Sequence, residues 1–295
     1  MPTATRLDVR DLFTAPAGYL NAATSGLAPR TVAQAMHEAV DAWSLGEGTL
    51  ACYDLAVARS RAAFARLVDV PTAQVAIGSQ VSVMVGAVAA SLPDGAHVLV
   101  AEGDFTSVTY PFLAQAHRGV QVRTAPAAAL AEAVRPGDDL VAFSLVQSAD
   151  GRVLDGAGVA AAARAAGART LVDLTQAAGW LPVHAGDYDV TVTGAYKWLC
   201  APRGAAFATV APAAMDWLRP TSAGWYAGAD LACSMYGTAM RLADDARRFD
   251  VSPAWLAWSG AAPALELAAD LDPADVRDHD VHLADGLRAE LGLPA

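Results

Sequence analysis

The chain has 295 residues, and its 20 Lys and Arg side chains stand against 31 Asp and Glu side chains, which gives a formal charge of -11. An acidic chain repels nucleic-acid backbones and anionic membrane surfaces, so we exclude nucleic-acid binding and peripheral membrane binding. Because 54% of the residues are hydrophobic and 17% are charged, the composition predicts a globular protein with a large core rather than a disordered chain.

Two stretches of the chain raise the question of targeting or membrane insertion. The opening sequence MPTATRLDVRDLF contains Asp8 and Asp11 and has no apolar core, so it does not predict a signal peptide. Residues 70–93 are uncharged and long enough to cross a bilayer, but the polar sequence GSQVS stands in their middle. We interpret this stretch as a strand, a turn and a helix.

The three cysteines, Cys52, Cys200 and Cys233, are widely spaced and form no CxxC pair. They predict neither a disulfide framework nor a structural zinc site, and no other metal site is expected. A reducing cytoplasm is the compartment that fits this cysteine usage.

From residue 54 to residue 217, β-rich runs alternate with Ala-rich helical stretches. The predicted strands occupy residues 75–78, 97–101, 120–124, 139–146, 168–174, 188–194 and 204–210. The predicted helices occupy residues 29–45, 54–68, 82–91, 107–117 and 156–166, a segment that begins at 252 or 253, and residues 272–291.

Several of the predicted strands are continuous apolar runs, which indicates burial on both faces of the sheet. We therefore predict an α/β fold with a mostly parallel seven-stranded sheet covered by helices, and a ligand site at the carboxyl ends of the strands. Residues 220–250 are rich in Gly, Trp, Tyr and Arg without a clear period, which predicts ordered loops over a site.

Lys197 is the only lysine of a chain that otherwise uses arginine for its basic side chains. A guanidinium supplies charge and hydrogen bonds, but it does not form the imine that a primary amine forms with an aldehyde. A single lysine shortly after a buried strand therefore indicates an amine that arginine cannot replace. The alternative is an ordinary surface lysine, retained by chance in an arginine-rich sequence.

Asp173 strengthens the functional interpretation because it ends the preceding predicted strand, 197 - 173 = 24 residues before Lys197. Pyridoxal phosphate (PLP) requires an amine for its aldehyde and a carboxylate that keeps its pyridine nitrogen protonated. Asp173 and Lys197 supply this pair. Taken alone, Asp173 is also consistent with a helix N-cap after a strand.

The segments VDLTQAAG and GAYKWLCAPRG resemble the cofactor segments of the class V aminotransferases, a PLP-dependent family that includes cysteine desulfurases, kynureninases and isopenicillin N epimerase-like enzymes. The resemblance implies the aspartate aminotransferase-like large domain of PLP fold type I. It implies that Lys197 forms the Schiff base, that Asp173 pairs with the pyridine nitrogen and that Gln176 binds the ring hydroxyl. Tyr196 would reach the phosphate, and Ala201 replaces a glycine of many members.

Three further segments extend the resemblance. IGSQVS resembles the strand-to-helix turn where the family binds phosphate, which implies Ser79 and Gln80 as phosphate ligands; an ST-type cap is the alternative. RRFDVSPAWLAW places Ser252 where the family's Thr reaches the phosphate of the neighbouring subunit, and SAGWYAG places Trp225 at the same shared site. These similarities imply a homodimer with composite active sites.

Two more positions concern the cofactor ring and the substrate. Phe105 in AEGDFTS follows a strand where the family stacks a ring on the cofactor; packing in the core is the alternative. YLNAATSGLAP resembles a segment that closes over the substrate, which implies Asn21 and Ala22 as pocket residues; a surface turn is the alternative.

The resemblance also divides the chain into parts. These are an N-terminal segment with a helix (1–53), a PLP-binding large α/β domain (54–250), and a linker helix with the start of a small C-terminal domain (251–295). Members of the family continue further, so the small domain is expected to be truncated or reduced. The arginine that holds the substrate carboxylate is therefore unassigned, with Arg241, Arg247 and Arg248 as candidates.

The function implied by the resemblance is that of an enzyme acting at the α-carbon of an amino-acid-like substrate. The substrate amine would displace Lys197 and leave it as the nearest base. Transamination and a lyase reaction are the two leading outcomes. One rival is a relative or partner subunit that binds PLP without turnover. Another is a dinucleotide-binding protein, but IGSQVS lacks the GxGxxG spacing.

Overall fold

A seven-stranded sheet forms the centre of the computed structural model, which describes residues 9–15 and 18–293. Asp8 of the opening sequence lies outside the described residues. The strands are β1 (Val75–Gly78), β2 (His97–Ala101), β3 (Gln121–Ala125), β4 (Leu140–Ser144), β5 (Arg169–Asp173), β6 (Val190–Gly194) and β7 (Ala206–Val210), in the order β1-β7-β6-β5-β4-β2-β3. Among these described strands β7 alone is antiparallel to both neighbours, which confirms the predicted mostly parallel sheet.

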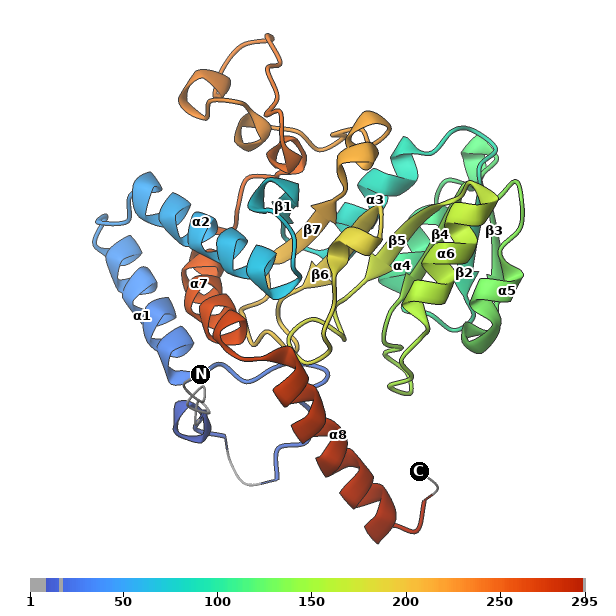
Figure 1. Ribbon diagram of the computed structural model, residues 1–295. Helices are drawn as coiled ribbons and strands as arrows, with labels where there is room; N and C mark the ends of the chain where they lie inside the picture. The colour runs from blue at the N-terminus through green and yellow to red at the C-terminus, as the bar shows by residue number, and fades with distance from the viewer. Residues whose placement is uncertain (1–8, 16–17, 294–295) are drawn as a thin grey trace, which may run out of the picture.

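Helices cover both faces of the sheet (Figure 1). They are α1 (Arg30–Ser44), α2 (Leu50–Leu67), α3 (Val81–Ser91), α4 (Thr106–Leu113), α5 (Leu130–Ala133), α6 (Gly156–Ala166), α7 (Trp255–Asp270) and α8 (Pro273–Glu290). On one face α3 and α4 form an apolar core with the strands, and on the other face α2, α5, α6 and α7 form a second core. Every residue of β4 and β6 is buried, as their continuous apolar sequences predict.

Helices α1 and α2 pack against α7 at the end of the sheet that β1 closes (Figure 1). Phe64 of α2 stacks on Phe207 of β7 with 4.3 Å between the ring centres, and Phe207 meets Trp258 of α7 edge to face. The described residues of α8 include no buried side chain, and this helix leads away from the rest of the molecule (Figure 1). No helix in the described ranges is long and apolar enough to cross a membrane.

Most predicted elements agree with the structure to within three residues, and the exceptions have local causes. Helix α2 begins at Leu50 because the Thr49 hydroxyl oxygen accepts a hydrogen bond from the Cys52 N–H and caps the helix. Helix α4 ends at Leu113, and the chain turns through a short 3-10 helix to Gly119, whose φ of 80° is left-handed. Residues 220–250 form loops with short 3-10 helices, but none of them lines the cavity described below.

Candidate active site

A cavity of about 320 Å³ lies at the carboxyl ends of the parallel strands, where the fold predicts a ligand site. Its lining residues are Ser79, Gln80, Val81, Ser82, Phe105, Ser107, Ser144, Val146, Ser148, Asp173, Thr175, Gln176, Gly194, Tyr196, Lys197, Arg203, Gly204 and Ala205. The predicted site residues among them are Ser79, Gln80, Phe105, Asp173, Gln176, Tyr196 and Lys197. The fold therefore brings most of the predicted cofactor site together within one chain.

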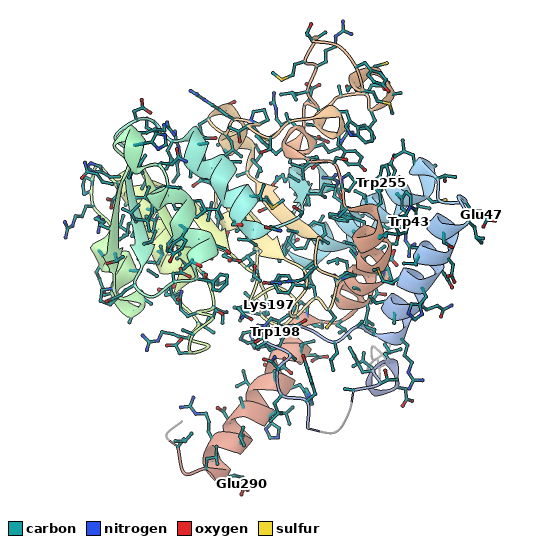
Figure 2. All side chains as sticks on the ribbon, turned by 180° about the vertical axis from the view of Figure 1, so that it is seen from behind. Trp43, Glu47, Lys197, Trp198, Trp255 and Glu290 are labelled. Carbon is teal, nitrogen blue, oxygen red and sulfur yellow. The ribbon has the colours of Figure 1, made fainter. Side chains whose placement is uncertain are left out.

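Lys197 lines this cavity and is only 7% exposed. Its Nζ atom lies 5.4 Å from the centre of the Phe105 ring and 6.0 Å from the centre of the Tyr196 ring. No carboxylate in the described part of the chain forms a salt bridge with it. Figure 2 shows Lys197 beside Trp198, well away from the labelled residues at the periphery. The alternative of an ordinary surface lysine is therefore wrong.

Asp173 ends β5 and faces the same cavity with 5% of its surface exposed. The Thr175 N–H donates a hydrogen bond to its Oδ1 at 2.8 Å, so the residue also forms a local turn, as the capping alternative anticipates in part. Burial raises the pKa of Asp173 to about 6; hydrogen bonds from Thr175 lower it, the charge of Asp104 raises it and the charge of Lys197 lowers it. A cationic partner in the cavity would favour the ionised form of this buried carboxyl group.

The raised pKa predicts that Asp173→Asn stabilises the cofactor-free protein at neutral and alkaline pH. The ordinary pKa is 3.8 and the folded pKa is about 6, so the contribution of Asp173 to stability is complete below pH 3.8 and is lost as the pH rises through about 6. Asparagine retains the acceptor for Thr175 without the charge. In urea unfolding we expect the variant to be more stable by about 1–3 kcal/mol at about pH 8, and equal to the wild type at about pH 4. A less stable variant at the higher pH would contradict this sign.

Gln176 joins the N-terminal segment to the lysine segment. Its Nε2 donates to the Ala23 carbonyl at 3.2 Å, and its Oε1 accepts a hydrogen bond from Trp198 Nε1 at 3.0 Å. The backbone at Gly26 approaches so closely that an added Cβ would lie 2.1 Å from the carbonyl oxygen of Lys197. Glycine is therefore required at this position for the N-terminal segment to pack against the lysine segment.

Helix α3 begins at the cavity without a side-chain cap. Its N-cap residue is Gln80, which makes no capping hydrogen bond, and Ser79, Gln80 and Ser82 all line the cavity. The alternative of an ST-type cap is therefore wrong. The first N–H groups of a helix and the positive end of its dipole favour an anion, which agrees with the predicted phosphate position.

Asp104 fixes Phe105 and Ser144 beside the cavity. Its Oδ1 accepts hydrogen bonds from the Phe105 N–H at 2.7 Å and the Ser144 hydroxyl at 2.6 Å, and its Oδ2 accepts one from the Ser144 N–H at 2.7 Å. Phe105 is 45% exposed, so packing in the core does not account for it. Our prediction missed Asp104, for which the available signal is a carboxylate shortly after a strand and directly before Phe105.

The predicted residues Asn21, Ala22, Trp225 and Ser252 do not line the cavity. Asn21 and Ala22 are exposed, and the Asn21 carbonyl accepts a hydrogen bond from the Thr24 N–H in a turn. The resemblance assigned Trp225 and Ser252 to a site shared with a second subunit and the other two to a closed substrate pocket. All four assignments remain predictions.

Among the described residues, the arginine that lines the cavity is Arg203, and none of the candidates Arg241, Arg247 and Arg248 does so. The guanidinium carbon of Arg203 lies 4.3 Å from the centre of the Tyr196 ring. Our prediction missed this residue as well. The available signal is its position in GAYKWLCAPRG, the segment that also contains Lys197.

A buried lysine and a buried carboxylate face one cavity at the ends of parallel strands, beside a helix terminus that favours an anion. These groups fit the aldehyde, the pyridine nitrogen and the phosphate of PLP, and they define the chain as a PLP fold type I protein. The family model for class-V aminotransferases matches residues 19–293, and the chain belongs to this family. The predicted family, its fold and PLP as its cofactor are thereby confirmed.

Individual relatives cover most of the chain. It is 29% identical to isopenicillin N epimerase of Streptomyces clavuligerus over 255 residues, 78% of this chain and 63% of the epimerase. It is 30% identical to kynureninase of Deinococcus radiodurans over 285 residues, 90% of this chain and 69% of the kynureninase. The solved structure of a mutant of the cystine C-S lyase C-DES, with glycine covalently linked to PLP, is similar over 84% of this chain and 70% of that one, with a TM-score of 0.75 at 23% identity.

Proposed function

We propose that the chain is a PLP-dependent enzyme that acts at the α-carbon of an amino-acid-like substrate, by transamination or by a lyase reaction. The observation that carries the proposal is the burial of Lys197 and Asp173 on one cavity. The names of the relatives, an epimerase, a kynureninase and a C-S lyase, support chemistry at an amino-acid carbon.

The residues of the cavity have separate tasks in this proposal. When bound, PLP supplies an aldehyde and a ring that accepts electrons from the α-carbon. The Nζ of Lys197 would hold the aldehyde and, when free, would move the proton at the α-carbon. Asp173 would keep a proton on the pyridine nitrogen, and Phe105, which lines the cavity and is 45% exposed, would be available to the ring.

The test of this function begins with an absorbance spectrum of the purified protein with PLP. We expect an absorbance band near the visible edge. Borohydride should then fix the cofactor covalently to Lys197. An amino-acid screen then separates the reactions. Transamination yields a keto acid without free ammonia, because the amino group stays on the cofactor as pyridoxamine phosphate, whereas a lyase releases ammonia with pyruvate, or alanine. A band without turnover of any amino acid would support the alternative of a PLP-binding relative. The absence of a band would contradict the proposal.

We retain as proposals a homodimer, a cytoplasmic location, and the division of the chain at residues 53 and 250. The dimer rests on the resemblance of the segments around Trp225 and Ser252, both of which lie outside the cavity of this chain. Residue 53 itself lies in the first turn of α2.

Subunit mixing tests the shared site. Lys197→Ala and Ser252→Asp are each expected to be inactive, the second because its charge repels the phosphate of the neighbouring subunit. In a heterodimer, one site combines the intact lysine of one chain with the intact serine of the other. An equal mixture of refolded variants should therefore regain about one quarter of the wild-type activity. Mixing without any regain, while Ser252→Asp alone is inactive, would place Ser252 at the site of its own chain.

A further inference from the structure

Arg203 stands where the chain enters β7, across from the turn that leaves β1. The two strands are antiparallel, and Gly78 at the end of β1 pairs with Ala206 at the start of β7. Gly204, with a φ of 105°, turns the chain between Arg203 and the strand in a conformation that favours glycine. The register therefore brings Arg203 and Ser79 to the same end of the cavity, which both residues line.

Arg203 is the cation of this cavity that the proposed chemistry does not use. Among the described residues that line it, the cations are Lys197 and Arg203, and the carboxylate is Asp173. This inference rests on the proposed function, in which Lys197 binds the aldehyde of PLP. Arg203 forms no salt bridge with a carboxylate of the described ranges.

The side chain of Arg203 is also held in place. Its guanidinium carbon lies 4.3 Å from the centre of the Tyr196 ring, within the range of a cation–π contact. The planar guanidinium has five N–H donors in a fixed fork, which can bind two oxygens of a phosphate at once. Tyr196, which the resemblance assigns to the phosphate, is thus the residue that orients Arg203.

We propose that Arg203 binds the phosphate of PLP together with the first turn of α3. A phosphate group carries roughly 1.5 to 2 negative charges at neutral pH, whereas a helix amino terminus supplies about half a positive charge. The chain has a formal charge of -11, and its single lysine binds the aldehyde in the proposed function. A fixed guanidinium therefore supplies the remaining positive charge for the phosphate.

The test compares PLP with pyridoxal, which has the same ring and aldehyde but no phosphate. For Arg203→Gln we expect the Kd for PLP to rise by about 10- to 100-fold and the Kd for pyridoxal to stay unchanged, measured by absorbance titration of the cofactor-free protein. Arg203→Lys retains the charge but not the planar fork and should be intermediate. Arg164→Gln removes an exposed arginine of α6 outside this cavity and should change neither Kd. Urea unfolding checks that each variant is folded.

Two results for the variants would overturn the proposal. Equal losses for PLP and pyridoxal would mean that Arg203 supports the cavity only through Tyr196. Unchanged affinity for both, with a raised KM for the amino-acid substrate, would assign Arg203 to the substrate carboxylate instead. A wild-type protein that binds neither compound would refute the proposed function itself, and this result is distinguishable because it involves no variant.

Discussion

Lys197→Arg is expected to abolish both covalent attachment of PLP and turnover while the protein remains folded. Arginine retains a positive charge beside Phe105, but its guanidinium does not form the imine that a primary amine forms. The proposed function also uses Lys197 to move the α-carbon proton, and loss of such a base alone lowers a rate by about 10²- to 10⁴-fold. The measurement is intact mass after borohydride reduction, in which the wild type gains one reduced PLP and the variant gains none.

The sequence makes this experiment easy to interpret because the chain has no second lysine. Lys197→Ala is the matched variant, since it removes the charge as well as the amine. We expect both variants to bind PLP reversibly, through the helix terminus of α3 and through Asp173. Covalent labelling of either variant by PLP and borohydride to the same extent as the wild type would contradict the assignment, because the attachment would then lie at another group.

The central part of the fold could be predicted because burial on both faces leaves a clear mark in a strand. The sequences of β4 and β6 consist of apolar residues and small hydroxyl residues, apart from one glycine, and all of these residues are buried. Each strand could therefore be predicted from its own sequence, without knowledge of its neighbours in the sheet. The ends of helices depend on single contacts. The start of α2 is set by one hydrogen bond to the Thr49 hydroxyl oxygen. The composition of the surrounding sequence does not reveal such a single contact.

The residues of the candidate site also differ in whether their own stretch of sequence or a distant contact decides their role. Lys197 and Asp173 could be predicted because few side chains can replace an amine or a buried acid. Asp173 ends β5, and Lys197 shortly follows β6. Arg203 was missed because its position in the lysine segment is the one signal in the sequence. Its place in the cavity that Ser79 also lines depends on the antiparallel register of β1 and β7, which joins distant parts of the sequence. Ser252 depends on a second subunit, so the geometry of one chain does not decide its role.

Asp250→Ala is expected to destabilise the protein by about 3–5 kcal/mol. Asp250 is completely buried and Arg61 is 7% exposed. The two groups form a bidentate pair, with 2.6 Å between Nη2 and Oδ2 and 3.2 Å between Nη1 and Oδ1. Removing the carboxylate leaves a buried guanidinium without its counter-charge, which costs far more free energy than the pair itself contributes.

This pair also forms hydrogen bonds with the backbone of β1 at the edge of the sheet. β1 is an edge strand, and Asp250 accepts a hydrogen bond from the Ile77 N–H at 2.8 Å while Arg61 donates to the Val75 carbonyl. An edge whose backbone groups lose these partners is less firmly held. Because β1 leads directly into Ser79, we expect Asp250→Ala to weaken PLP binding as well.

Urea unfolding of Asp250→Ala measures this loss. Asp250→Leu, Arg61→Met and the double variant Arg61→Met/Asp250→Leu then form a closed cycle that tests the account. Each single variant leaves one buried charge uncompensated, whereas the double variant removes both charges and keeps apolar volume. The double variant should therefore lose less stability than either single variant. It should still be less stable than the wild type, because the Ile77 N–H and the Val75 carbonyl lose partners worth about 1–3 kcal/mol each. A loss equal to the sum of the two single losses would show that the groups act independently and that charge compensation does not hold this edge.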